Sequence, residues 1–323
     1  MATVRAAGVL DIGSNSVLLL VAAVDPEGQL AIVDRALVTT QLGAGLVDGG
    51  PLAAGARERT ARAVAALVAR ARAAGAARLW GFATGAARRA ADGAAFVGEL
   101  AVASGVSIVV LTGEAEARLA YAAVAAGLGP GTAPVLVADV GGGTTELTLG
   151  IGTVVREAVS LPLGALRLTE TALAGDPAPA DAWDRLAVHV ADVLAGAPVL
   201  AHARTAGATL AISGGTATAL ATVDLGLTVY DAARVHGHVL ARAALEGLVV
   251  RLARQPIAAR EGLGGLDSGR ARILPAGALI ALALVSALDV PGLRVSDHGV
   301  RHAYLVERLT AEGVALRAEG PWA

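Results

Sequence analysis

Residues 135–149 constrain the fold more than any other stretch, because they join two strands through consecutive glycines. Val135 to Val140 is a short apolar run typical of a buried strand, and Asp139 lies at its end. Three glycines follow at 141–143, and residues 147–149 alternate like a second strand. The sequence therefore predicts a strand, a turn almost without side chains, and a second strand.

Such a turn suits a phosphate group held beside a divalent cation. Glycines let backbone N–H groups converge on an anion without steric hindrance. Asp139 supplies an oxygen ligand for a hard cation, and Glu146 adds a second carboxylate. The alternative is an ordinary tight hairpin, which rarely needs three glycines and does not account for the aspartate. The expected phosphate-binding residues here are Gly141, Gly142, Gly143, Thr144 and Thr145.

The same pattern occurs near the N-terminus. An apolar strand ends at Asp11, a turn of small residues follows, and a second apolar strand runs from Val17 to Val24. Asp11 and Asp139 are 128 positions apart (139 − 11), about one domain length, which suggests two similar domains. Ordinary turn chemistry would also explain the small residues. Because it pairs with the turn at 141–145, we expect the turn at 13–16 to bind phosphate as well, through Gly13, Ser14, Asn15 and Ser16.

Three further segments are candidates for the site. Arg88 or Arg89, after the strand-like stretch 79–83, could reach an anionic substrate or lie on the surface at a helix start. Glu116 lies in the first turn of an expected helix, where the helix dipole alone favours an acid. A third glycine turn at 213–216 opens another expected helix, whose N–H groups can receive an anion.

Composition excludes several classes of function. The net charge is −2 and aromatic residues make up 2% of the chain, so neither a basic field nor stacking platforms favour nucleic acid. Cysteine is absent, which excludes thiolate metal sites and a thiol nucleophile. The apolar run from Ile273 to Val290 contains Pro275 and is short for a membrane span, so we expect a buried helix. An aspartate in the first apolar stretch argues against a signal peptide, which favours a soluble, cytoplasmic protein.

Taken as an ordered set, these segments resemble the exopolyphosphatase / guanosine pentaphosphate phosphohydrolase (Ppx/GppA) family over nearly the whole chain. The resemblance rests mainly on the segments 11–16, Gly113-x-x-Glu116-Ala117-Arg118 and 139–146. Three more segments match in the same order: 160–164, 213–216 and 295–301.

The resemblance implies an α/β fold with two actin-like ATPase (ribonuclease H-like) domains around an interdomain cleft. The glycine-rich segment 127–132 places the expected boundary between an N-terminal domain, 1–126, and a C-terminal domain, 127–323. The last helix is expected to pack back on the first domain. The family also implies a homodimer.

The implied activity is Mg²⁺-dependent removal of terminal orthophosphate from inorganic polyphosphate, with Mn²⁺ as a substitute metal. By motif, Glu116 is the general base that activates water, and Glu146 assists it or holds the metal. Asp11 and Asp139 are expected metal-side carboxylates, and Arg88 a further contact for the anion. Phosphoryl transfer consists mostly of positioning and charge neutralisation, which this residue set can supply.

Three alternatives have different substrates or none. A guanosine pentaphosphate 5′-phosphohydrolase would use the same centre, although the scarcity of aromatic residues slightly favours polyphosphate. A kinase of the same superfamily fits the segment 213–216 but not Glu116-Ala117-Arg118. A non-catalytic sensor would bind polyphosphate or the nucleotide without turnover, and the presence of both glutamates argues against it.

The chain departs from the family pattern at three positions. Ala115 replaces one of two adjacent glutamates, and Asp92 stands where an asparagine is common. Arg301-His302-Ala303 replaces Arg-Glu-Gly near the end. The last change puts contacts to long substrates or domain closure in doubt, rather than the hydrolytic centre.

Overall fold

The chain forms two compact units, Met1–Leu119 with Val300–Ala323, and Ala120–Gly299. The computed structural model describes residues 6–129, 131–317 and 321–322. Pro130, in the glycine-rich segment of the expected domain boundary, lies outside the described residues. Each unit is built on a mixed β-sheet with helices, and each is described by itself below.

The sheet of the first unit has the strand order β3-β2-β1-β4-β5. β1 pairs antiparallel with β2 and parallel with β4. β1 is apolar on both faces and buried along most of its length, as a central strand requires. The strands are β1 (Ala6–Ile12), β2 (Ser16–Val24), β3 (Leu30–Thr39), β4 (Arg78–Ala83) and β5 (Ser107–Val110).

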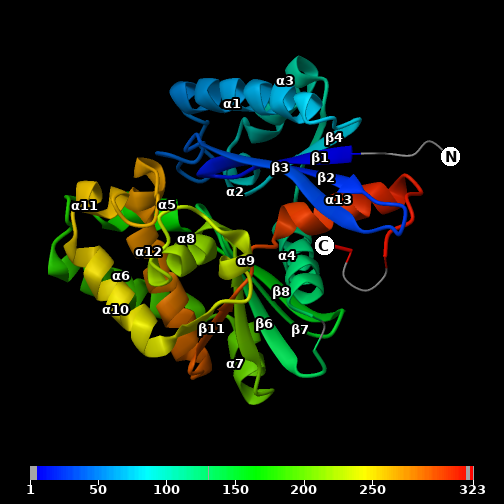
Figure 1. Cartoon of the computed structure of the whole chain (residues 1–323). Coiled ribbons are helices and arrows are strands. Elements are labelled where there is room, and N and C mark those ends of the chain that lie inside the picture. Colours follow the sequence, from blue (N-terminus) through cyan, green and yellow to red (C-terminus); the bar gives the residue numbers. More distant parts are fainter. Residues whose placement is uncertain (1–5, 130, 318–320, 323) are drawn as a thin grey trace. The chain divides into compact units, whose positions relative to one another are not determined.

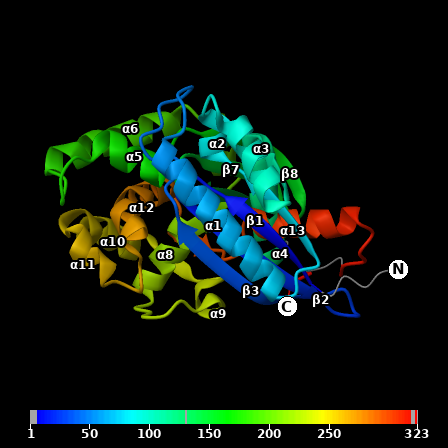
Figure 2. The same cartoon turned by 90° about the horizontal axis from the view of Figure 1, so that it is seen from above.

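Helices cover both faces of this sheet. In Figure 1, α1 (Ala54–Ala73) and α3 (Gly93–Ser104) lie on one side of it, and α13 (Val300–Ala311) lies on the other. Figure 2 looks down on α1, which packs across β1, β2 and β3. α1 buries one stripe at helical spacing: Ala56, Thr60, Ala63, Val64, Leu67, Val68 and Ala71. The short helix α2 (Gly85–Arg89) directly follows β4.

The second unit repeats this strand arrangement. Its sheet has the order β10-β11-β9-β6-β7-β8, with β6 in the position of β1 and β7 in that of β2. Asp139 on β6 therefore occupies the place that Asp11 has on β1, and the internal repeat expected from the sequence is confirmed. The strands are β6 (Pro134–Val140), β7 (Thr145–Ile151), β8 (Val154–Leu161), β9 (Thr209–Ser213), β10 (Val239–Ala241) and β11 (Gly292–Val295).

The large core of the second unit lies on one face of its sheet. Leu136 and Ala138 of β6 point into it, and α12 (Ser268–Leu288) crosses it. By its length and composition α12 would also pass as a membrane span, but 13 of its residues are buried, which is the pattern of a core helix. The surrounding helices are α5 (Ala165–Ala172), α6 (Ala180–Ala195), α7 (Pro198–Thr205), α8 (Gly214–Asp224), α9 (Ala232–Val235), α10 (Arg242–Arg254) and α11 (Ile257–Glu261).

One helix, α4 (Gly113–Leu128), begins in the first unit and continues into the second. Its second half packs on the other face of the second sheet, where Tyr121 and Val124 meet Val137 and Ala211. Val137 alternates along β6 with residues of the main core, as the period of two in a strand requires. The Tyr121 hydroxyl donates to the carbonyl of Gly152 at 3.0 Å, which fixes this half of α4 on the sheet.

Candidate active site

Two carboxylates face each other at the end of β6 in the second unit. Asp139 and Glu146 are direct partners in the antiparallel ladder of β6 and β7, so their side chains project from the same face. Each offers an oxygen within 4.8 Å of the other's. Asp139 is 9% exposed and Glu146 is 2% exposed. Two buried carboxylates so close together repel each other unless a cation or proton compensates them.

Serine hydroxyls hold both carboxylates in place. Ser213 Oγ donates to Asp139 Oδ1 at 3.1 Å, and Ser160 Oγ donates to Glu146 Oε1 at 2.7 Å. Each serine bond occupies one of the roughly four lone-pair positions of an ionised carboxylate. The donor set consists entirely of oxygens, which fits a hard divalent cation such as Mg²⁺ and not a soft metal.

The glycine turn between β6 and β7 presents its backbone N–H groups. Gly141 N–H donates to the carbonyl of Thr144 at 3.0 Å and closes the turn. The carbonyls of Gly141 and Gly142 accept from the first N–H groups of α5 at 2.9–3.0 Å, which orients them toward that helix. The N–H groups of Gly142, Gly143 and Thr144 have no acceptor among the residues that the structure describes. Adjacent free N–H groups form the kind of nest that binds a phosphate oxygen.

Thr145 has a different role from its neighbours. Its hydroxyl donates to the carbonyl of Leu163 at 2.6 Å and is fully buried. That bond ties β7 to the segment leading into α5, which is the segment that backs the glycine turn. Its predicted contact with phosphate remains a prediction.

The third glycine turn, at the start of α8, lies against Asp139. Gly214 has φ +87°, and a Cβ atom there would lie 2.4 Å from Asp139 Oδ1. Only glycine can therefore bring the N-terminus of α8 this close to the carboxylate. The guanidinium of Arg270 packs on the next residue, Gly215, where a Cβ would lie 2.3 Å from Nη2. Burial lowers the pKa of Arg270, and the charge of Asp267 partly offsets that effect.

The turn at residues 13–16 of the first unit is built in the same way. Gly13 N–H donates to the carbonyl of Ser16 at 2.9 Å, and residues 14–16 are buried. Backbone N–H groups of the loop after β3 donate to the carbonyls of Ser14 and Asn15 at 2.8–3.0 Å. The N–H groups of Ser14 and Asn15 have no acceptor within the described part of the chain. Asn15 Oδ1 is buried there without a donor among the described residues.

The two turns differ in their acidic residues. Asp11 on β1 is opposite Leu18 on β2, whereas Asp139 on β6 is opposite Glu146 on β7. The second unit thus pairs two carboxylates at its turn, and the first unit places a single carboxylate, partly exposed, at the corresponding place.

Glu116 in the first turn of α4 is bound by an arginine. Arg88 Nη1 lies 2.8 Å from Glu116 Oε2 and also donates to the carbonyl of Leu111 at 3.0 Å. The hydroxyl of Thr112 accepts from the N–H of Ala115 at 3.1 Å and caps the helix. The start of α4 therefore does not depend on Glu116 for capping, which was the alternative explanation of an acid at this position.

The neighbouring charged residues are paired with each other. Of the two candidate arginines, Arg88 contacts Glu116, whereas Arg89 lies 2.6 Å from Asp48. Asp92 accepts from Leu52 N–H at 2.9 Å and from Arg57 at 2.7 Å, and the bond from Leu52 chiefly lowers the pKa of Asp92. The negative charge that Asp92 adds to the family pattern is thus neutralised by Arg57.

Sequence reasoning did not identify Arg270 or the loop at 40–43 as parts of these sites. Arg270 precedes an apolar run and reads as the polar start of a buried helix. Its only local signal is a cation in the first turn of this helix, which Arg272 shares. The loop donates through backbone N–H groups of Thr40, Gln41 and Gly43, which no side-chain motif encodes. The φ of Gln41 is +51°, a strained value for a non-glycine residue.

Comparisons with known proteins agree on one family. The chain matches the Ppx/GppA phosphatase family over residues 20–312. It is 30% identical over 320 residues to exopolyphosphatase 1 of Mycobacterium tuberculosis, covering 96% of this chain and 90% of the relative. Exopolyphosphatase 2 of the same organism is 31% identical over 332 residues, covering 99% of this chain and all of the relative.

Solved structures show the same fold. The crystal structure of the Aquifex aeolicus member of the Ppx/GppA family has a TM-score of 0.77 and 30% identity, covering 96% of this chain and 99% of that one. An exopolyphosphatase from Cytophaga hutchinsonii has a TM-score of 0.86 at 18% identity, covering 96% and 99% of the two chains, and so supports the fold alone. The predicted α/β fold class is confirmed, with the fold of the solved Ppx/GppA structures.

Proposed function

The chain belongs to the Ppx/GppA phosphatase family, and we propose that it is an exopolyphosphatase that releases terminal orthophosphate from inorganic polyphosphate. The observation that supports this proposal most directly is the pair of carboxylates Asp139 and Glu146 beside a glycine turn with free N–H groups. Relatives at about 30% identity that carry the name exopolyphosphatase support the choice of substrate.

We propose that Asp139 and Glu146 hold a Mg²⁺ ion, for which Mn²⁺ can substitute, and that Asp11 contributes a further carboxylate. A bound divalent cation neutralises charge on the phosphate oxygens and on the carboxylates themselves. Asp139 and Glu146 are close enough to share a ligand, and their serine partners fix the positions of the receiving oxygens. Such charge compensation would let a polyanionic substrate approach carboxylates that would otherwise repel it.

Glu116 is the proposed general base. Its carboxylate accepts a proton from a water molecule, and the oxygen of that water forms a bond to the terminal phosphorus while the bridging P–O bond breaks. Arg88 holds the carboxylate of Glu116 in one orientation. The turns at 13–16 and 141–145 bind the phosphate groups through backbone N–H groups and hydroxyls.

The test compares two substitutions on the same turn of α4. Glu116→Gln keeps the shape of the side chain and removes the base, so orthophosphate release from short polyphosphate should fall by roughly 10²–10⁴-fold. Glu114→Gln is the matched control, because Glu114 is exposed and pairs with Arg118 at 3.0 Å. Release is measured with Mg²⁺, after chelation and after Mg²⁺ or Mn²⁺ is restored, with thermal unfolding as a check on folding.

The outcomes of this test distinguish the exopolyphosphatase from the nucleotide phosphohydrolase and from the non-catalytic sensor. Release from polyphosphate that depends on the metal and is lost only in Glu116→Gln supports the proposal. A preference for guanosine pentaphosphate under the same conditions would assign the protein to nucleotide hydrolysis instead. Tight binding of either compound without release would leave a non-catalytic sensor and contradict the proposed reaction.

We also propose that the enzyme is a cytoplasmic homodimer, as the family resemblance implies. Sedimentation of the purified chain tests the dimer, and fractionation of cells that express it tests the location. A monomer at assay concentrations would contradict the first, and recovery in the membrane fraction would contradict the second.

A further inference from the structure

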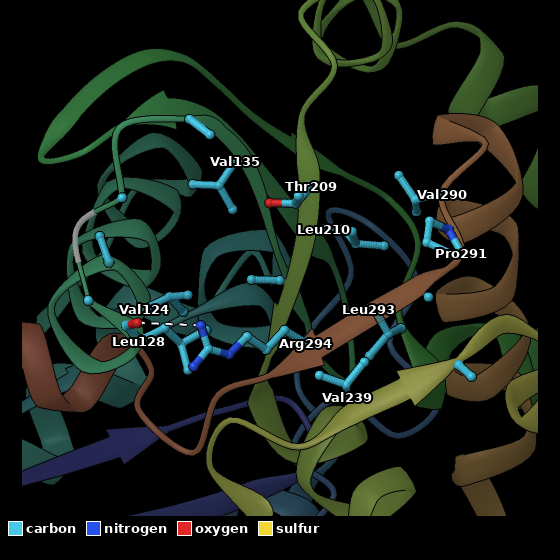
Figure 3. Close-up of a pocket in the computed structure, with 17 residues that line it drawn as sticks. Val124, Leu128, Val135, Thr209, Leu210, Val239, Val290, Pro291, Leu293 and Arg294 are labelled. Carbon is cyan, nitrogen blue, oxygen red and sulfur yellow. Dashed lines mark hydrogen bonds between the residues drawn. The ribbon is translucent and has the colours of Figure 1, made fainter.

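A cavity of about 620 Å³ lies in the second unit, away from its glycine turns. One wall is the second half of α4, and the other is the outer face of β9, β11 and β10 (Figure 3). Val135 and Thr209 at its edge lie at the N-terminal ends of β6 and β9, whereas the glycine turns follow the C-terminal ends of these strands. Its volume is within the range of roughly 300–1,000 Å³ that small-molecule sites occupy. We refer to it as the outer pocket.

The outer pocket exists because the sheet presents very small residues to it. Ala211, Ala241 and Gly292 line its floor, and they cannot fill the space beside α4. Val124 and Leu128 of α4 face this floor across the pocket in Figure 3. Val239, at its rim, is 65% exposed. A concave apolar surface that stays open to solvent is typical of a binding site rather than of a packing defect.

One charged residue defines the polarity of this pocket. Arg294 is the single ionisable side chain among its described lining residues, and it is exposed. Its Nη1 donates to the carbonyl of Leu128 at 3.4 Å, a long bond that leaves other guanidinium N–H groups for a ligand (Figure 3). Leu128 ends α4, where the helix dipole is negative, and the cation offsets that field at the pocket.

From this combination, we propose that the outer pocket binds a small amphipathic anion: an apolar body carrying a carboxylate, sulfonate or phosphate group. The apolar body lies between Leu128 and the floor formed by Ala211 and Gly292. The acidic group pairs with Arg294, and the hydroxyl of Thr209 offers a further polar contact. The described lining contains no aspartate or glutamate that would repel such a ligand.

The experiment uses the full chain and two fluorescent probes of one shape. The probes are 1-anilinonaphthalene-8-sulfonate, which is anionic, and N-phenyl-1-naphthylamine, which is uncharged. Arg294→Leu removes the charge and keeps an apolar side chain, so it should weaken binding of the sulfonate about tenfold and leave the uncharged probe unchanged. Arg251→Leu is its control, because Arg251 is exposed on α10 outside the pocket.

A second variant fills the cavity. Ala241 is exposed in the pocket and lies opposite Gly292 in the ladder of β10 and β11, so Ala241→Trp places an indole over an empty floor. It should weaken binding of both probes by at least about tenfold relative to the control Ala243→Trp, because Ala243 is an exposed residue on α10.

Three results would overturn the proposal. The first is sulfonate binding that Ala241→Trp leaves intact, which would locate the probe elsewhere. The second is an equal response of both probes to Arg294→Leu, which would describe an apolar site without charge selection. The third is that the wild-type chain binds neither probe and that Ala241→Trp has a lower mass in sedimentation than the wild type. That result would show that a second copy of the chain covers this face.

Discussion

At the scale of single residues, the contact between Arg88 and Glu116 gives the candidate base a defined orientation. Arg88 Nη1 donates both to the carboxylate of Glu116 and to the carbonyl of Leu111, so its position is fixed by the backbone as well as by its charge partner. The bond to Glu116 Oε2 therefore comes from a nitrogen that the backbone carbonyl also positions, which restricts the orientation of the carboxylate. In this pair Arg88 is the positioning residue and Glu116 is the candidate base that it positions.

Arg88→Gln should lower kcat for orthophosphate release by roughly 10²-fold, because a base displaced by about an ångström loses its alignment with the attacking water. Arg89→Gln is the control on the same short helix, since Arg89 pairs with the exposed Asp48. The rates are measured at saturating polyphosphate and Mg²⁺. Equal losses in the two variants would show that α2 contributes only general positive charge.

Tyr121 predicts how stability changes in alkaline solution. Burial raises the pKa of Tyr121, whereas the unfolded chain loses the phenol proton near pH 10. Above that pH the native state binds more protons than the unfolded state, so stability falls as pH rises. Tyr121→Phe should show a flatter decline in unfolding free energy between pH 10 and 11 than the wild type. At pH 7 the variant should lose about 1 kcal/mol with its bond to Gly152. If denaturant titrations show that the unfolding free energies of the wild type and Tyr121→Phe fall in parallel between pH 10 and 11, this explanation is refuted.

At the scale of elements, each glycine or small-residue turn is supported by the segment that follows the third strand of its sheet, after β3 in the first unit and after β8 in the second. The start of α5 donates to carbonyls of the turn at 141–143, and the loop at 40–43 donates to carbonyls of the turn at 13–16. In both units the carbonyls are occupied on one side and the N–H groups remain for a ligand. The proposed binding of an anion thus depends on the pair of segments and not on the turn alone.

Gly164→Ala tests this support. Gly164 has φ −140° and ψ 143°, which alanine tolerates, but its Cβ would lie 2.3 Å from the carbonyl carbon of Gly143. The turn must shift, so KM for polyphosphate should rise at least about tenfold, and stability should fall by about 1–3 kcal/mol. Gly98→Ala on α3 is the control: nothing lies within 4 Å of its Cβ, and it should stabilise the chain by about 1 kcal/mol without changing KM. An unchanged KM in Gly164→Ala would argue against binding at this turn.

The same elements show what the sequence could predict. The strands that carry Asp11 and Asp139, and the glycine turn after the second, depend on neighbours within a few residues, so local patterns were sufficient to predict them. The contact of Arg270 with Gly215 joins positions 55 apart, and that of Arg88 with Glu116 joins positions 28 apart. Such contacts depend on how helices pack on the sheets, which hydrophobic periodicity does not specify. The fold class and the family were therefore predictable, whereas the groups that orient the carboxylates were not.

At the scale of the whole molecule, the last helix belongs to the first unit. Tyr304 of α13 lies against Phe82 of β4, with ring centroids 4.9 Å apart, and Arg308 lies 5.6 Å from the ring centroid of Trp80. The chain thus leaves the first unit within α4, completes the second unit, and returns at Val300.

Tyr304→Ala should destabilise the first unit selectively, by about 3 kcal/mol, because it removes a buried ring from the contact with Phe82. Amide hydrogen exchange should accelerate in β1, β2 and β4 and stay unchanged in β6 and β7. Thr310→Ala, at an exposed position of the same helix, serves as the control. Equal acceleration in both sheets would show that the two units unfold as one cooperative body.

The return of α13 also determines the order in which the protein can fold during its synthesis. When β1 to β5 leave the ribosome, the helix that covers one face of their sheet has not been translated. Residues 120–299 must be made first, which takes on the order of ten to forty seconds at roughly 5–20 residues per second. The second unit is contiguous in the chain and can finish folding in that interval. The unit that is translated first is therefore completed last, and its uncovered sheet face is the surface that a chaperone would meet on the nascent chain.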